Sequence, residues 1–160
     1  MRIGVPKEIK PQENRIGLTP ESVKVLTSNG HKVLVQNNGG FEAGFYNNQY
    51  IKAGATIVDK VEDIFNDSEV IVKVKEPLSE EIKMIKENQI IFTYLHLAAD
   101  KKLTEGLVKS KSICIAYETV TDNDGRLPLL APMSAVAGRM SIQAGAHSLE
   151  LIMVNVHYYP

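Results

Sequence analysis

The chain has 160 residues, of which 44% are hydrophobic and 23% are charged, as in ordinary globular proteins that bury a core. Its formal net charge of -1 at pH 7 gives no reason to expect nucleic acid or an anionic membrane as a partner. No apolar run could span a bilayer or form a signal-peptide core, and the single cysteine excludes an internal disulfide and a cysteine-rich metal site, so we expect a soluble, cytoplasmic protein with no metal centre.

Six short apolar segments rich in β-branched residues are predicted to be strands. In chain order they are Arg2–Val5, His31–Gln36, Ala55–Val58, Ser68–Val74, Ile90–Leu95 and Ser112–Glu118.

Amphipathic segments between these strands are predicted to be helices. The first follows Thr19, which can cap it, begins at Pro20 and ends at Gly30. Two more are predicted within residues 77–88 and 100–111, where apolar residues recur three or four positions apart. The alternation predicts an α/β fold of the flavodoxin or Rossmann-like type, with a mostly parallel open sheet and helices on both faces.

The pattern changes after the last predicted strand. The segment "TDNDGRLPLLAP" (Thr121–Pro132) contains a predicted turn at Asn123–Gly125. A helix is then predicted to begin at or near Ser134 and to continue to about Glu150. Residues 151–160, "LIMVNVHYYP", form an apolar tail for which the pattern predicts no partner.

Three cationic or titratable side chains are predicted at carboxyl ends of strands, where open parallel sheets bind ligands. Arg15 lies in the loop after the first strand, Lys75 follows the fourth strand, and His96 follows the fifth. Arginine can hold a carboxylate through two hydrogen bonds, lysine can donate to a carbonyl or carboxylate oxygen, and histidine can exchange a proton near neutral pH. Together they predict a site for a small carboxylate that also carries a carbonyl or an amine.

Each candidate also has a purely structural interpretation. Arg15 can be a solvated surface charge, Lys75 an edge lysine that keeps its ammonium in water, and His96 a core histidine bonded to a backbone carbonyl. Ser134 can cap its helix, whose N-terminus can also attract an anion. Glu118, at the predicted end of its strand, can orient a catalytic group or face solvent.

The glycines do not have the spacing of a nucleotide-binding loop. Neither G-x-G-x-x-G nor G-x-x-x-x-G-K-[ST] occurs, and "NNGGFEAGF" (Asn37–Phe45) is predicted to be an ordinary loop. These 160 residues therefore predict no dinucleotide-binding domain of their own.

Four segments together resemble the NAD-dependent L-alanine dehydrogenase family. They are "MRIGVPKEIKPQENRIGLTPESV", "VIVKVKEP", "FTYLHLA" and "LPLLAPMSAVAGRM". The resemblance extends from Met1 to about Glu150. It implies a substrate domain in residues 1–131, an interdomain helix in residues 132–150 and a divergent tail in residues 151–160.

The resemblance also implies roles for individual residues. Arg15 and Lys75 would hold the carboxylate and carbonyl of the substrate, His96 would donate and accept protons, and Ser134 would contact NAD. The implied reaction is the oxidative deamination of L-alanine to pyruvate and ammonia, with NAD accepting the hydride.

In the family an NAD-binding domain follows the position of Glu150, and a segment returning from the C-terminus completes the substrate domain. Neither is present here, so the resemblance implies a truncated or frameshifted chain that is inactive by itself. Besides L-alanine or pyruvate, its expected partners are further copies of itself or a separate chain that supplies the NAD-binding domain.

Other functions stay open on the sequence alone, and saccharopine-type dehydrogenases are the more distant among them. The nucleotide-binding subunit of proton-translocating transhydrogenase is similar in fold but has no need of an amino-acid site, so Lys75 and His96 favour the dehydrogenase. A non-catalytic remnant or interaction module would keep the fold and turn over no substrate.

Overall fold

The computed structural model describes residues 1–156, and of residues 151–156 it gives only the course of a helix. The chain divides into two compact units, Met1–Tyr117 and Glu118–Pro160. The apolar tail predicted at residues 151–160 therefore continues a helix at first, and residues 157–160 lie outside the described residues.

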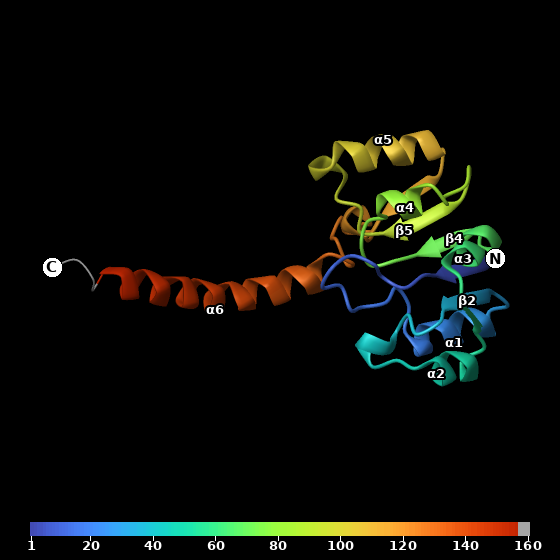
Figure 1. Ribbon diagram of the computed structural model, residues 1–160, viewed down its shortest axis with the longest axis horizontal. Helices are drawn as coiled ribbons and strands as arrows, with labels where there is room; N and C mark the ends of the chain where they lie inside the picture. The colour runs from blue at the N-terminus through green and yellow to red at the C-terminus, as the bar shows by residue number, and fades with distance from the viewer. Residues whose placement is uncertain (157–160) are drawn as a thin grey trace. The chain divides into compact units, whose positions relative to one another are not determined.

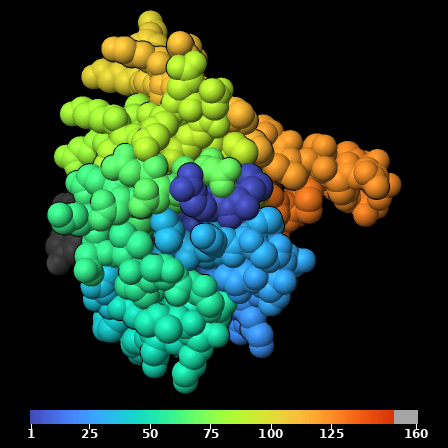
Figure 2. All heavy atoms as spheres, turned by 90° about the vertical axis from the view of Figure 1, so that its right-hand side faces the viewer, coloured from blue at the N-terminus to red at the C-terminus, as the bar shows by residue number. Residues whose placement is uncertain are grey.

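The first unit is built on a six-stranded, fully parallel sheet in the order β3-β2-β1-β4-β5-β6. All the predicted strands are confirmed, each within its predicted limits. They are β1 (Arg2–Val5), β2 (Lys32–Gln36), β3 (Thr56–Val58), β4 (Val70–Val72), β5 (Ile90–Thr93) and β6 (Ile113–Ala116). β1 lies in the middle of the sheet, and Figure 2 shows the start of the chain near the centre of the face that it views.

Helices cover both faces of this sheet. Ile71 and Val72 are neighbours on β4 and belong to different hydrophobic clusters, because successive strand residues point to opposite faces. One cluster packs under α1 (Pro20–Ser28) and α2 (Asn47–Lys52), which lie near β2 in Figure 1. The other packs under the remaining helices of the unit, which are α3 (Val61–Asp67), α4 (Ser79–Ile82) and α5 (Lys101–Ser110). The predicted fold class is confirmed.

The start and end of α1 follow from local chemistry. The hydroxyl of Thr19 accepts a hydrogen bond from the backbone N–H of Ser22 at 3.3 Å, and Pro20 occupies the first turn. Gly30 has φ +81°, a left-handed conformation that suits the chain leaving a helix. The predicted limits of this helix are confirmed.

α5 confirms the helix predicted within residues 100–111, but other helices differ from the prediction. Neither α2 nor α3 was predicted, and Ser68, the first residue of the predicted fourth strand, instead terminates α3. α4 has four residues, far fewer than the predicted helix at 77–88, because the bonds Met84 N–H to Glu81 O and Ile85 N–H to Ile82 O tighten the chain into a turn. Glu118 does not end β6 but lies in the 3-10 turn η3 (Tyr117–Thr119).

The second unit contains a turn and a long helix. The backbone N–H of Gly125 donates to Asp122 O at 3.1 Å, which confirms the turn predicted there. The helix, α6 (Ala131–Val156), begins before Ser134, whose own N–H donates to Leu130 O at 3.1 Å. The interpretation of Ser134 as the cap of this helix is therefore wrong. Over the part of the chain that the structure describes, no helix combines the length and apolar character needed to cross a membrane.

The buried phenol of Tyr50 makes stability depend on alkaline pH. Tyr50 is 1% exposed, and its hydroxyl donates to Leu18 O at 2.9 Å. Burial raises the pKa of Tyr50 to about 12 from its ordinary value of 10.0. The folded protein holds this proton more tightly than the unfolded chain does, so the associated stability is complete below about pH 10 and is lost as the pH rises towards 12.

We therefore expect the free energy of unfolding to fall by about 2 kcal/mol between about pH 9 and pH 12 through Tyr50 alone. Tyr50→Phe removes this titration, so its curve of stability against pH should be flatter in that range. Urea unfolding followed by circular dichroism measures both curves. Parallel curves for the two proteins would contradict the prediction.

Candidate active site

The topology of the sheet reverses at its central pair of strands. β1 and β4 are neighbours, and the chain leaves them in opposite directions, towards β2 and β5. The loops that follow such strands diverge, and open parallel sheets bind ligands at this point. Arg15 lies in the loop after β1, Lys75 in the loop after β4, and His96 after β5, the neighbour of β4. All three predicted residues thus belong to the same edge, and their sharing of one small cleft stays a prediction.

A buried ion cluster fixes the loop after β1 against the end of β4. One carboxylate oxygen of Glu8 accepts the backbone N–H of Val74 at 2.6 Å, and the other lies 3.2 Å from Lys73 Nζ. Lys73 Nζ also donates to Glu81 Oε1 at 2.7 Å, and the side chains of Lys73 and Glu81 are 1% and 2% exposed. The cluster therefore sets the position of the backbone that carries Lys75.

Gly17 allows the same loop to lie directly on β4. A Cβ atom at this position would come within 2.6 Å of Val72 O and 2.9 Å of Val72 C. Any other residue would push the loop, and Arg15 with it, away from the strand.

The guanidinium of Arg15 is held by Glu13. Nε and Nη2 of Arg15 donate to the two carboxylate oxygens of Glu13 at 2.8 and 2.6 Å, and the backbone N–H of Arg15 donates to Glu13 Oε1 at 2.9 Å. These hydrogen bonds lower the pKa of Glu13 and raise the pKa of Arg15, with smaller contributions to the former from Lys75 and to the latter from Tyr94. Arg15 is thus not simply a solvated charge, because Glu13 holds its guanidinium through two side-chain hydrogen bonds.

Tyr94 stacks beside His96. Their ring centroids are 6.1 Å apart, and the rings are inclined by 27°. Tyr94 also contacts Tyr117, whose ring meets it edge to face at a centroid distance of 5.0 Å and whose pKa is raised by burial. The side chain of His96 is 52% exposed and its backbone has φ +50°, so the interpretation of His96 as a core histidine is wrong.

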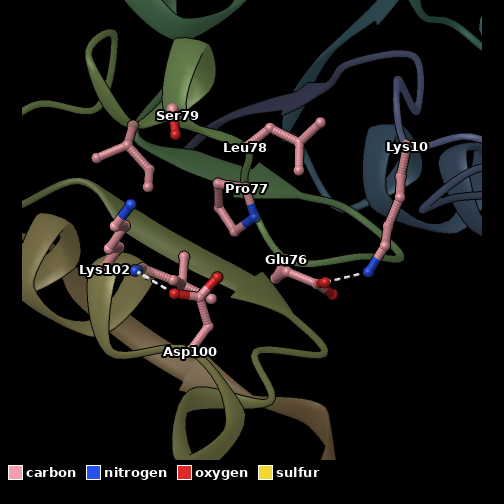
Figure 3. Close-up of a pocket in the computed structure, with 9 residues that line it drawn as sticks. Lys10, Glu76, Pro77, Leu78, Ser79, Asp100 and Lys102 are labelled. Atoms are coloured by element: carbon pink, nitrogen blue, oxygen red, sulfur yellow. Dashed lines mark hydrogen bonds and ion pairs between the residues drawn. The ribbon is translucent and has the colours of Figure 1, made fainter.

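Glu76 connects His96 to the loop after β1. Its Oε1 pairs with Lys10 Nζ, and its Oε2 lies 3.4 Å from His96 Nδ1. Glu76 and Lys10 also border a cavity of about 310 Å³ whose further lining includes Pro77, Ser79 and Asp100 (Figure 3). Figure 3 shows the carboxylate of Glu76 turned towards Lys10.

Three residues of this region escaped the sequence analysis, namely Glu13, Glu76 and Tyr94. Each lies within two positions of a predicted site residue, and Tyr94 shares the strand-end segment of His96. A carboxylate next to each functional cation was the signal that could have identified Glu13 and Glu76.

Ser134 belongs to the second unit, so its contact with a cofactor stays a prediction. Within residues 1–150, no group of three or more histidine, cysteine, aspartate or glutamate side chains is arranged to hold a metal ion.

Known proteins are similar to this chain in sequence. The model of a family described as "Alanine dehydrogenase/PNT, N-terminal domain" matches residues 4–137. Alanine dehydrogenases of Halomonas elongata and Staphylococcus epidermidis are 53% and 55% identical over 150 residues, which are 94% of this chain and 40% of each relative. The chain thus spans about 40% of the length of the curated relatives it matches.

Two solved structures are similar as well. An L-alanine dehydrogenase superposes with a TM-score of 0.86 at 50% identity, over 94% of this chain and 41% of that chain. A transhydrogenase from Sinorhizobium meliloti superposes with a TM-score of 0.70 at 24% identity, over 74% of this chain and 34% of that chain, which is a similarity of fold alone.

Proposed function

The chain belongs to the alanine dehydrogenase/PNT N-terminal domain family, and from this premise we propose that it forms the substrate-binding part of a cytoplasmic, NAD-dependent L-alanine dehydrogenase. The proposed reaction converts L-alanine to pyruvate and ammonia while NAD takes the hydride. Residues 1–131 would form the substrate domain and residues 132–150 the interdomain helix. The observation that carries the proposal is the placement of Arg15, Lys75 and His96 at one edge of three neighbouring strands.

Arg15 and Lys75 are proposed to hold the substrate. Glu13 holds the guanidinium through Nε and Nη2, which fixes the direction in which Arg15 would present its charge to a substrate carboxylate. Lys75 is proposed to add a second positive charge near this pair, and it makes a small contribution to the lowered pKa of Glu13. It would donate to the carbonyl oxygen of pyruvate.

His96 is proposed to move protons at the substrate nitrogen and oxygen. In the deamination direction an imine is hydrolysed, so a base must take a proton from the attacking water and an acid must give one to the departing ammonia. An imidazole can do both near neutral pH. Its partly exposed position at the strand end gives it the access that this role requires.

The first unit does not fit NAD at the carboxyl edge of its own sheet. Its strand order is that of a dinucleotide-binding fold, in which a glycine-rich loop after β1 receives the pyrophosphate. Here the loop after β1 is not glycine-rich, and its Glu8 is a buried carboxylate that already occupies Lys73 and the N–H of Val74. We therefore assign NAD only the proposed contact with Ser134 within this chain. The similarity to transhydrogenase concerns the fold alone, and the cations at this edge favour a small acid over a second nucleotide.

Pyruvate binding tests the proposal on this chain directly. We expect pyruvate to shift the amide resonances of the loops after β1, β4 and β5 in NMR titrations. Arg15→Met and Lys75→Met should each weaken binding by about 10- to 100-fold, the cost of losing a charged hydrogen bond. Lys101→Met is the matched control, because Lys101 is 87% exposed and pairs with Glu105 on the surface of α5. Acetone, which lacks the carboxylate, should produce no such shifts.

Absence of pyruvate binding would contradict the proposal and favour a non-catalytic remnant. Equal affinity in the wild type and in both variants would show that pyruvate binds elsewhere.

A further inference from the structure

We propose that Glu76 is a positioning residue that holds the proton of neutral His96 on Nδ1, so that Nε2 is the nitrogen that accepts protons in the reaction. The inference deepens the proposed function, because it assigns the two ring nitrogens of His96 their separate tasks. Lys10 completes the arrangement by pairing with the other carboxylate oxygen of Glu76, Oε1.

The geometry assigns this task to one oxygen of Glu76. The side chain is 16% exposed, and Oε2 is buried and accepts no hydrogen bond of standard geometry from the described residues. The nearest ring nitrogen of His96 to it is Nδ1, at 3.4 Å, which is within ion-pair reach and long for a hydrogen bond. Contacts of this kind often tighten when substrate binds.

The tautomer follows from the chemistry of the two facing atoms. A buried carboxylate oxygen gains from a donor, and leaving it unsatisfied is costly. If Nδ1 carries the hydrogen, it can donate to Oε2. If Nε2 carries it, the lone pair of Nδ1 faces the lone pairs of the carboxylate, and the two repel. The hydrogen bond made by one ring nitrogen thus decides the protonation of the other.

Glu76 is suited to this role because it stays ionised. Burial is the largest single effect and raises the pKa of Glu76. It is outweighed by the hydrogen bond from Lys10, a backbone hydrogen bond and the charges of Lys10 and His96, so the pKa lies below its ordinary value of 4.5. At neutral pH the carboxylate is therefore an acceptor for Nδ1–H and not a competing donor.

The backbone around these residues is also fixed. His96 has φ +50° and begins the 3-10 turn η2 (Leu97–Ala99), whose Ala99 N–H donates to His96 O at 3.1 Å. Lys10, Glu76 and His96 come from the loops after β1, β4 and β5, so their side chains link the three loops that form the edge of the sheet.

The test uses the full 160-residue chain labelled with nitrogen-15. Long-range correlation spectra of the imidazole rings report which nitrogen carries the hydrogen, and His96→Asn identifies the signals of His96. In the wild type we expect the neutral ring to be mainly the Nδ1–H form. Glu76→Gln, which keeps the shape but loses the charge, should shift the tautomer ratio towards Nε2–H by about fivefold, and Glu76→Leu should shift it further.

Glu87→Gln is the matched control, because Glu87 also pairs with a lysine, Lys111, but on the surface at 3.5 Å. Its spectrum should show the wild-type tautomer of His96. Amide spectra establish that each variant is folded, and the wild-type measurement decides the matter even if a variant does not fold. A wild-type ring that is mainly Nε2–H, or a folded Glu76→Leu with unchanged ring signals, would overturn the inference.

Pyruvate titrations separate this inference from the proposed function. If the neutral ring is mainly Nδ1–H but the chain does not bind pyruvate, the assignment of Glu76 stands and the proposed enzymatic role is contradicted. If the chain binds pyruvate but the ring is mainly Nε2–H, only the assignment of Glu76 is contradicted.

Discussion

Replacing Lys73 with methionine is expected to lower the free energy of unfolding by about 3–5 kcal/mol. The ammonium of Lys73 lies between the carboxylates of Glu8 and Glu81, and the exposed fractions of all three side chains are 2% or less. Without it, two negative charges would remain buried next to each other with only backbone N–H groups as partners. A loss of this size is a large part of the total free energy of unfolding of an ordinary domain.

Urea unfolding followed by circular dichroism measures the loss. Lys101→Met removes a lysine from the exposed pair with Glu105 and should change the free energy of unfolding by no more than about 0.5 kcal/mol. The triple variant Glu8→Gln, Lys73→Met, Glu81→Gln removes the buried charges together and should recover part of the loss. An unfolding midpoint for Lys73→Met equal to that of Lys101→Met would show that the buried cluster contributes little.

Local sequence patterns predicted the strands, whereas contacts in the tertiary structure set the lengths of several helices. The strands were predictable because β-branched runs bounded by polar residues are a local property of the chain. The length of α4 was not, because Glu81 turns inward to Lys73 and back to the N–H of Leu78, and both contacts depend on the tertiary structure. α2 and α3 have six and seven residues, too few to show a helical period, and packing stabilises them.

The candidate site was also predictable only in part. Arg15, Lys75 and His96 could be placed at one edge because parallel strands all point their carboxyl ends in one direction. The pairing of Glu76 with Lys10 could not be predicted, because it joins residues 66 positions apart and depends on how two loops fold over the sheet. Periodicity carries no information about such loops. The limits of α6 show the same weakness, because Ser134 has the residue type of a cap but lies inside the first turns of the helix.

Replacing His96 with asparagine should lower turnover by about 10²- to 10⁴-fold in an enzyme assembled around this domain. A suitable enzyme joins residues 1–150 of this chain to the part of the Halomonas elongata alanine dehydrogenase that follows its matched region, because the two sequences are 53% identical over 150 residues. Asparagine keeps a polar group of similar size but cannot exchange a proton near neutral pH. Arg15 and Lys75 remain, so the KM for pyruvate should change only a few fold while kcat collapses.

The control for this loss is His31→Asn in the same assembled enzyme. His31 precedes β2 at the amino edge of the sheet, where its Nδ1 lies 3.3 Å from the N-terminal amine, far along the strands from the candidate site. Its kcat should stay within about twofold of the parent, in keeping with a substitution away from the reacting groups. The pH profile of kcat/KM adds a second readout, since the limb that reports the essential acid or base should disappear only in His96→Asn. If His96→Asn keeps kcat within tenfold of the parent and keeps that limb, another group moves the proton, and the edge formed by β1, β4 and β5 binds the substrate without supplying the acid and base.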